Sequence, residues 1–365
     1  MTAGSPIVAL AERAPSPELR QRVRDALAAG AVCALPTETV YGLAARADLP
    51  AAVEELRRLK GRPSALAFTW HVAERSAIES FAALRPLARR LVERYWPGPL
   101  TLVLPGIPSG LEGIARDGWT GLRLPAHAGC QGLLAACPFP VVMTSANLHG
   151  ESPAVEAEGV ARRFGAELAL VVDGGPARLG EASGVLALGP GRFELLREGL
   201  LRLEDLRRTA GLRIAFVCTG NTCRSPMAEA LARQLLGERL GIVPSHSLAD
   251  FGFEVASMGV SAASGAPASL GALEALAPRG LDLRAHRSRP ASPEVLARFD
   301  RIYCLTEGHR SALRALLPPA RHAPVALLDP DCKDISDPIG GPPSAYQRAL
   351  ADIENALRRR LGEWA

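Results

Sequence analysis

A short apolar run that ends at a cysteine constrains the fold of this chain more than any other feature of its sequence. Residues 214–217 are apolar, as in a buried strand, and residues 218–224 after them read Cys-Thr-Gly-Asn-Thr-Cys-Arg. Pro226 suits the first turn of a helix, and residues 227–235 are rich in helix formers. The sequence therefore predicts a strand, a tight loop and a helix N-terminus in immediate succession.

The predicted loop has the properties of an anion site. Successive backbone N–H groups in such a turn converge on an anion, and the positive end of the helix dipole adds to the attraction. Cys218 at the start of the loop would lie in the same field, which favours a nucleophilic cysteine. Arg224 at the end of the loop could hold two phosphate oxygens. An ordinary strand-to-helix turn is the alternative, and the cysteine and arginine that bracket the loop argue against it.

This stretch resembles the low-molecular-weight protein phosphatases, whose loop reads Cys-x5-Arg-Ser before a helix. The resemblance covers about the last 155 residues, and its later landmarks are residues 261–263, 286–289 and 337–338. It implies that Cys218 attacks phosphorus, that Arg224 holds the phosphoryl oxygens and that Asp337 protonates the leaving group. Three more residues would support the phosphate loop: Asn221, Thr222 and Ser225, the last by a hydrogen bond to the thiolate.

Two choices within this resemblance stay open. Asp329 also precedes a proline and is the rival to Asp337, which is preferred because residues 337–341 match the family better in frame. Thr222 stands where tyrosine-directed members usually have a bulky aliphatic residue, and Ile-Gly-Gly replaces the aromatic residues that would hold a phenol ring. The threonine form resembles the protein-arginine phosphatases, which implies phosphoarginine over phosphotyrosine as the group on the phosphoprotein substrate. Arsenate reduction is disfavoured, because the other cysteines are not spaced as the relay that it needs.

The first half of the chain carries polar motifs where predicted strands and helices end. Residues 35–43 read Leu-Pro-Thr-Glu-Thr-Val-Tyr-Gly-Leu, and residues 60–63 read Lys-Gly-Arg-Pro. A lysine and an arginine at the exit of a helix suit a phosphate chain, although a solvated helix end has the same pattern. Three further motifs follow at residues 96–102, 144–147 and 183–199.

In order and spacing, these five motifs resemble the YrdC family of threonylcarbamoyl-adenylate synthases over about the first 200 residues. The resemblance implies that L-threonine, bicarbonate and ATP, with Mg²⁺, give threonylcarbamoyl-AMP and pyrophosphate. A separate transferase would then use the product to modify adenosine 37 of certain tRNAs. The residues that would bind ATP are Lys60, Arg62, Ser145, Asn147 and Arg197. Those that would bind threonine are Thr37, His71, Arg123, Thr144 and Ser183, with Arg123 on its carboxylate.

Several positions keep a second interpretation open. Gly184 stands where the family usually has threonine, residues 66–68 read Leu-Ala-Phe instead of Asn-Pro-Leu, and His71 could equally be a packed histidine. The alternative function is a non-catalytic RNA- or nucleotide-binding module that serves the phosphatase. Retention of the Lys-x-Arg and Ser-x-Asn pairs favours catalysis.

The chain is expected to be α/β throughout and to form two domains, because 365 residues are long for one core. A YrdC-like mixed sheet is predicted for residues 1–205 and a doubly wound parallel sheet for residues 212–365, with a linker at 206–211. The strand candidates in the first half are residues 31–35, 100–104, 141–144 and 168–172. The helix candidates there are residues 51–59 and 83–95, and a third helix is expected at 293–299.

Composition limits the partners and the compartment. A net charge of +4 is too small for a protein that coats nucleic acid by charge, although tRNA stays a possible partner. No run of about 18 apolar residues predicts a membrane span, and the N-terminus does not have the pattern of a secretory signal. Seven cysteines at irregular spacing fit a reducing compartment. The expected location is the cytoplasm, with no metal site and no cofactor for the phosphatase.

Overall fold

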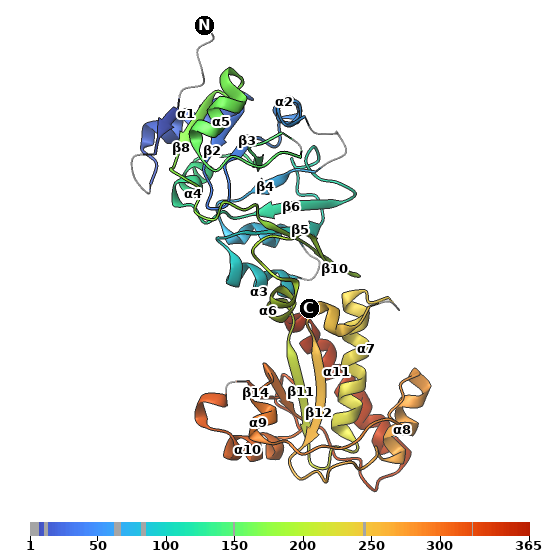
Figure 1. Cartoon of the computed structure of the whole chain (residues 1–365). Coiled ribbons are helices and arrows are strands. Elements are labelled where there is room, and N and C mark those ends of the chain that lie inside the picture. The colour runs from blue at the N-terminus through green and yellow to red at the C-terminus, as the bar shows by residue number, and fades with distance from the viewer. Residues whose placement is uncertain are drawn as a thin grey trace. The chain divides into compact units, whose positions relative to one another are not determined.

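Two compact units make up the chain, Met1–Leu206 and Arg207–Ala365 (Figure 1). The computed structural model describes residues 7–10, 14–61, 67–81, 85–148, 150–243, 246–322 and 324–365. The boundary between the units falls within helix α6 (Leu203–Ala210), so most of the segment predicted as a linker is helical. Each unit has its own sheet.

A mixed sheet of ten strands forms the framework of the first unit, in the order β1-β8-β2-β3-β7-β4-β6-β5-β9-β10. Its strands are β1 (Ile7–Ala9), β2 (Cys33–Leu35), β3 (Gly42–Arg46), β4 (Thr69–His71), β5 (Leu100–Pro105), β6 (Trp119–Arg123), β7 (Val141–Ser145), β8 (Leu170–Asp173), β9 (Gly184–Gly189) and β10 (Arg192–Arg197). The α-helices before α6 are α1 (Pro17–Ala28), α2 (Pro50–Lys60), α3 (Arg85–Tyr95), α4 (Ala128–Ala135) and α5 (Ala157–Phe164). Short 3-10 helices lie at Arg75–Ser80 and Gly165–Glu167. Parallel and antiparallel pairs both occur, so the predicted mixed α/β sheet is confirmed.

Helices cover both faces of the central part of this sheet. Leu43 and Val142 pack with residues of α2 and α5 in one core cluster. Their sequence neighbours Ala44 and Met143 pack with α1 and α4 in another. Successive side chains of a strand point to opposite faces, so this alternation follows directly from strand geometry. Burial on both faces explains why these strands are apolar runs rather than alternating patterns.

The second unit is built on four parallel strands in the order β12-β11-β13-β14. The strands are β11 (Arg213–Cys218), β12 (Glu254–Gly259), β13 (Arg301–Cys304) and β14 (Val325–Leu327). The helices are α7 (Arg224–Leu240), α8 (Leu270–Leu276), α9 (Pro293–Leu296), α10 (Glu307–Leu316) and α11 (Pro343–Trp364), with 3-10 turns at Leu248–Phe251, Ala277–Arg279 and Pro319–Arg321. The parallel α/β sheet is thus confirmed, while α9 is shorter than predicted. In the described stretches of the chain, no helix has the length and apolar character needed to cross a bilayer.

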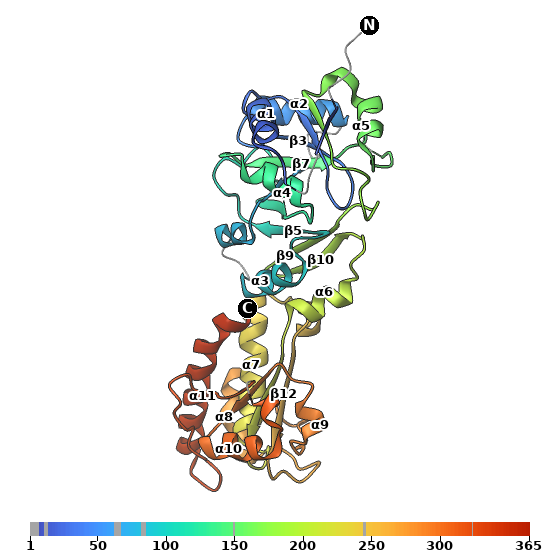
Figure 2. The ribbon, with the colours of Figure 1, turned by 90° about the vertical axis from the view of Figure 1, so that its left-hand side faces the viewer.

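The strand order of the second unit places the loop that follows β11 at a reversal in the direction of winding. In Figure 1 α9 and α10 lie to the left of the strands and α7 to the right, and Figure 2 shows α11 beside α7. Because β11 has β12 on one side and β13 on the other, the direction of winding reverses at β11. Ligands in open parallel sheets bind at the carboxyl ends of strands beside such a reversal. Cys218, the last residue of β11, lies at this point.

An aromatic cluster anchors α11 to the sheet. The ring centroids of Phe216 and Tyr303 are 6.1 Å apart, and Trp364 lies 6.4 and 5.6 Å from them. Trp364 Nε1 donates a hydrogen bond of 3.0 Å to the Tyr303 hydroxyl. The last helical residue of α11 is therefore held both by packing and by a buried polar contact.

Replacing Trp364 should destabilise the second unit. Trp364→Ala leaves a large cavity beside Phe216 and should lower the free energy of unfolding by about 3–5 kcal/mol. Trp364→Phe keeps part of the packing and should lower it less. Leu270→Ala is the control, because Leu270 is 69% exposed and its loss should change stability by less than about 0.5 kcal/mol. Urea unfolding of the three variants, followed by circular dichroism, measures the effects; equal losses for Trp364→Ala and Leu270→Ala would contradict the packing role.

Candidate active sites

A cavity of about 740 Å³ in the first unit collects the predicted site residues. All of those that the structure describes line it: Thr37, Lys60, His71, Arg123, Thr144, Ser145, Asn147, Ser183 and Arg197. Arg62, the remaining predicted ATP ligand, lies outside the described residues. Lys60 is the last residue of α2, and His71, Arg123, Ser145 and Arg197 end β4, β6, β7 and β10. Residues inside β5, β6 and β7 line the cavity as well, so it extends along the sheet and is not confined to one edge.

The predicted Lys-x-Arg and Ser-x-Asn motifs meet inside this cavity. Gly61, in the left-handed conformation at φ 58°, ends α2 and leaves Lys60 at its exit. The Lys60 ammonium donates to the Ser145 carbonyl at 2.7 Å, to Ser145 Oγ at 3.1 Å and to Asn147 Oδ1. These three partners are oxygens of the Ser-x-Asn motif, and they fix the position of the buried ammonium at the exit of α2.

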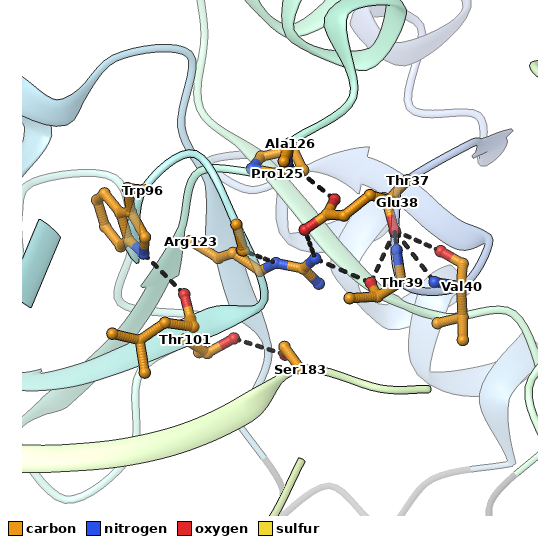
Figure 3. Close-up of polar contacts among 12 residues, drawn as sticks. Thr37, Glu38, Thr39, Val40, Trp96, Thr101, Arg123, Pro125, Ala126 and Ser183 are labelled. Carbon is orange, nitrogen blue, oxygen red and sulfur yellow. Dashed lines mark hydrogen bonds and ion pairs between the residues drawn. The ribbon is translucent and has the colours of Figure 1, made fainter. Parts of the chain in front are cut away.

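Arg123 is fixed in the same cavity by a carboxylate and a hydroxyl (Figure 3). Its Nη2 donates to Glu38 Oε1 at 2.7 Å and to Thr39 Oγ1 at 2.8 Å, and its Nε donates to the Gly98 carbonyl at 3.2 Å. The other Glu38 oxygen accepts the Ala126 N–H at 2.9 Å. Both members of the ion pair are buried, and the second carboxylate oxygen is satisfied, as a buried pair requires.

Arg197 lies close enough to Arg123 for their charges to interact. Its Nε and Nη2 donate to the carbonyl and hydroxyl of Ser183 at 2.9 and 3.2 Å, and Ser183 Oγ is 2.9 Å from Thr101 Oγ1 (Figure 3). Burial, and then the positive charge of Arg123, lower the pKa of Arg197. Two guanidinium groups that repel each other in one cavity favour an anion between them. At Gly184 an added Cβ would lie 3.8 Å from the Arg197 carbonyl, an ordinary contact, so close packing does not demand this glycine.

His71 is an uncharged member of the cavity wall. Its Nδ1 is 3.1 Å from the Thr69 carbonyl, and its side chain is buried beside Arg123, its partner in the β4–β6 register. Burial, and then the positive charge of Arg123, lower its pKa to about 3. At neutral pH the imidazole therefore adds no positive charge to the site.

Buried hydrogen bonds hold the predicted phosphate loop of the second unit, residues 218–225. Cys218 Sγ is 3.0 Å from Ser225 Oγ, and both residues are buried. Asn221 Nδ2 donates to Ser225 Oγ and to Ser257 Oγ, each at 2.9 Å. Asn221 has a φ of 54°, in the left-handed region that asparagine tolerates better than most residues. Its side chain thus fixes both the bend of the loop and the serine beside the sulfur.

Arg224, the first residue of α7, is almost fully buried behind the loop. Its Nη1 donates to the Ile335 carbonyl at 3.0 Å, and its Nη2 donates to Asp337 Oδ2. In the described part of the chain its Nε is the one buried side-chain nitrogen or oxygen without a hydrogen-bond partner. A buried N–H of this kind is costly unless an anion satisfies it, which fits a phosphoryl group at this loop.

Asp337 and its rival Asp329 have different partners. The Asp337 carboxylate contacts Arg224 and is 41% exposed, so it is open to a leaving group. Asp329 Oδ1 accepts the Asp331 N–H at 2.7 Å and lies 3.8 Å from Arg359. This geometry favours Asp337 as the group beside the phosphate loop.

The predicted specificity residue Thr222 lies at the edge of the loop. Its carbonyl accepts the Ser269 N–H at 2.9 Å, which ties the loop to the start of α8. Its hydroxyl is 3.6 Å from Cys223 Sγ, a weak contact. Cys223 Sγ also lies 3.1 Å from Ser269 Oγ and 3.8 Å from the Tyr346 hydroxyl.

Comparison with known proteins assigns the units to two families. The Sua5/YciO/YrdC model, described as telomere recombination, matches residues 25–199, and the low-molecular-weight phosphotyrosine protein phosphatase model matches residues 213–363. A putative threonylcarbamoyl-AMP synthase of Mycobacterium tuberculosis (strain H37Rv) is 33% identical over 198 residues, 52% of this chain and 88% of that protein. The protein-arginine-phosphatase of Geobacillus stearothermophilus is 37% identical over 150 residues, 40% of this chain and 92% of that protein. The chain belongs to both families.

The synthase-family relatives differ from this chain in extent. The threonylcarbamoyl-AMP synthase of Bacillus subtilis (strain 168) is 37% identical over 183 residues, 49% of this chain and 53% of that protein. The chain thus spans about half the length of the first curated relatives that it matches. A crystal structure of Pyrococcus abyssi Sua5 complexed with L-threonine has a TM-score of 0.52 at 23% identity, covering 70% of this chain and 92% of that one. At this identity the likeness shows a shared fold.

Three polar side chains at these sites had no predicted role. Glu38 and Thr39 hold Arg123 in the synthase-family unit, and His309 contacts Thr219 in the phosphatase-family unit. A buried arginine needs a carboxylate, and Glu38 is the carboxylate within the motif already noted, so the sequence contained a usable signal. The chain has seven histidines, and no motif or pattern in the sequence singled out His309.

The low pKa of His71 predicts a loss of stability in acid. Between pH 6.5 and about 3 the unfolded chain binds a proton at His71 that the folded chain does not, so folding weakens as the pH falls through this window. One such group contributes about 1.4 kcal/mol per pH unit well below its unfolded pKa. His71→Gln does not titrate and should show a shallower decrease in the free energy of unfolding between pH 7 and pH 4.5, measured with urea. The same slope in both proteins would show that His71 is not buried as a neutral group.

Proposed function

We propose that this chain is a bifunctional enzyme located in the cytoplasm. The synthase-family unit would convert L-threonine, bicarbonate and ATP to threonylcarbamoyl-AMP and pyrophosphate. The phosphatase-family unit would hydrolyse phosphoproteins with Cys218 as the nucleophile. The observation that carries the first activity is the cationic cavity, and the observation that carries the second is the pairing of Arg224 with Asp337 behind the phosphate loop.

The charge of the cavity fits anionic substrates. Five cationic side chains line it: Lys60, Arg116, Arg123, Arg192 and Arg197. Among the described lining residues Asp117 is the single carboxylate, and it pairs with Arg116 at 3.1 Å. A triphosphate, a carbamate and an amino-acid carboxylate are all anions, so a cavity of this sign favours binding all three.

The proposed reaction needs charge stabilisation more than acid–base groups. Threonine and bicarbonate form a carbamate with loss of water; a carbamate oxygen then bonds to the α-phosphorus of ATP, and the bond to the β-phosphate oxygen breaks to release pyrophosphate. Negative charge develops on the phosphate oxygens and on the leaving group, where Lys60 and Arg197 would stabilise it. Arg123, held on one side by Glu38, would present its other edge to the threonine carboxylate.

Mg²⁺ would enter this site with ATP. Among the residues described, no three histidine, cysteine, aspartate or glutamate side chains gather as metal ligands. Mg²⁺ commonly keeps several waters and binds through substrate phosphates, so those oxygens would hold it here. The product is a reactive mixed anhydride, and we propose that a separate transferase delivers its threonylcarbamoyl group to adenosine 37 of tRNA.

Pyrophosphate release tests the synthase proposal. The full chain should release pyrophosphate from ATP only when both threonine and bicarbonate are present. Lys60→Ala should lower kcat by about 10²–10³-fold, the usual loss on removing one group that stabilises transition-state charge. Lys333→Ala is the matched control, since Lys333 is the other lysine of the chain and is 76% exposed in the phosphatase-family unit. Nucleotide binding without threonine-dependent turnover would instead support a non-catalytic module.

The phosphatase proposal follows from the loop geometry. The Cys218 thiolate would bond to phosphorus as the bond to the leaving group breaks, and Asp337 would donate the proton that the leaving group needs. Water would then cleave the phosphocysteine, with Asp337 as the base. The Ser225 hydroxyl beside Sγ would stabilise the thiolate, and Arg224 would hold the phosphoryl oxygens in both steps.

We propose phosphoarginine as the preferred group. The Thr222 hydroxyl at the edge of the loop offers a polar partner where a phenol ring would need an apolar one. Ile339, 60% exposed after the Asp-Pro pair, supplies an aliphatic surface without an aromatic ring, which suits the stem of an arginine.

Paired peptide substrates test the phosphatase proposal. The full chain should hydrolyse phosphoarginine peptides faster than phosphotyrosine peptides, and Cys218→Ser should remove both activities. Asp337→Asn should lower kcat by about 10²–10⁴-fold, the usual contribution of a general acid. Asp329→Asn is the matched control and should change kcat little. A larger loss for Asp329→Asn would show that Asp329, and not Asp337, is the general acid. Equal rates on both peptides would contradict the proposed role of Thr222 in substrate preference.

A further inference from the structure

A buried histidine joins the phosphate loop to the helix behind it. His309 is 6% exposed and lies in the first turn of α10. Its Nε2 is 2.9 Å from Thr219 Oγ1, and its Nδ1 is 2.9 Å from Thr306 Oγ1. Thr219 directly follows Cys218 and is itself exposed, so the contact reaches from the core to the rim of the loop.

The same turn of α10 also holds the segment that carries Asp337. The Glu307 N–H donates to Asp334 Oδ1 at 2.7 Å, and the Ile335 N–H donates to the Leu305 carbonyl at 2.8 Å. The Ile335 carbonyl in turn accepts from Arg224. The start of α10 is thus a common anchor. Backbone and carboxylate contacts fix the segment that carries Asp337, and His309 is the side chain of α10 that reaches the phosphate loop.

The charge state of His309 suits this bridging position. Burial, and then the positive charge of Arg224, lower its pKa, while Asp337 and Asp334 act in the opposite direction. A neutral imidazole has one N–H and one lone pair, and each hydroxyl can either donate or accept. Each ring nitrogen therefore has a hydroxyl partner in either tautomer of the imidazole.

We propose that His309 is a positioning residue for the phosphate loop, acting through the Thr219 hydroxyl to keep the loop in register with Asp337. The inference rests on the phosphatase activity proposed for the same unit. Without the contact the Ser261 N–H still holds the Thr219 carbonyl at 3.0 Å, but the Thr219 side chain is no longer fixed, so the N–H groups next to Cys218 are aimed less precisely at the phosphoryl oxygens. Preorganised donors stabilise a transition state better than donors that must reorganise, so turnover falls more than stability.

Four substitutions in the full chain test this role. His309→Leu removes both contacts, and Thr219→Val removes the hydroxyl partner with little change in volume. His309→Gln places an amide where Nε2 lies and can still reach Thr219, whereas His309→Asn places it where Nδ1 lies and reaches Thr306 only. The Gln and Asn variants are therefore a matched pair that separates the bridge to the loop from the local contact within α10.

Hydrolysis of p-nitrophenyl phosphate and binding of orthophosphate provide two measurements. His309→Leu, His309→Asn and Thr219→Val should each lower kcat/KM and weaken orthophosphate binding by about tenfold, equivalent to one lost positioning contact. His309→Gln should recover most of both. The double variant Thr219→Val with His309→Leu should be no worse than either single variant, because both remove the same interaction.

Different outcomes would overturn the positioning role of His309 and the proposed phosphatase activity. Wild-type kcat/KM and orthophosphate binding in His309→Leu would overturn the positioning role, as would additive losses in the double variant. Equal losses in the Gln and Asn variants that follow a lowered melting temperature would show a purely structural histidine. If the wild-type chain hydrolyses no phosphate ester while orthophosphate binding still responds as expected, the positioning role stands and the proposed phosphatase activity fails.

Discussion

The burial of a guanidinium beside a single carboxylate is the interaction on which both sites depend. Arg123 and Arg224 are each about one-twentieth exposed or less, and each donates through Nη2 to one carboxylate, Glu38 or Asp337. Each also donates to a backbone carbonyl. Removing an ion from water costs several kcal/mol, so such a group stays inside only where partners fix it. The consequence is a cation of fixed position with donors left for a ligand.

The two units place these cations by the same geometric device. In the first unit the site residues lie where β4, β6, β7 and β10 end, and in the second the loop follows the end of β11. A sheet is rigid, so its neighbouring strands bring side chains that are far apart in sequence into one cavity without a long loop. The direction of winding reverses at β11, where Cys218 ends its strand, and ligands of open parallel sheets bind beside such a reversal.

The chemistry of the two sites differs in what supplies the positive field. The first cavity relies on lysine and arginine side chains, which suits a long triphosphate that must be oriented over several ångströms. The second relies on a tight loop whose shape depends on Asn221 and on a contact from His309, which suits one phosphoryl group held against one sulfur atom.

Local signals in the sequence were enough to determine the two-domain α/β organisation, the strand–loop–helix at Cys218 and the motifs whose residues line the first cavity. Such features depend on a few neighbouring residues: apolar runs, a proline in a first turn, and hydroxyl or charged groups at a strand end. Short strands such as β1 and β4, the helical course of the segment expected as a linker, and the partner His309 came only from the tertiary structure. The physical reason is that a three-residue strand is stabilised by its neighbours in the sheet, and a buried polar side chain is stabilised by a partner distant in sequence. Neither produces a periodic pattern in the sequence.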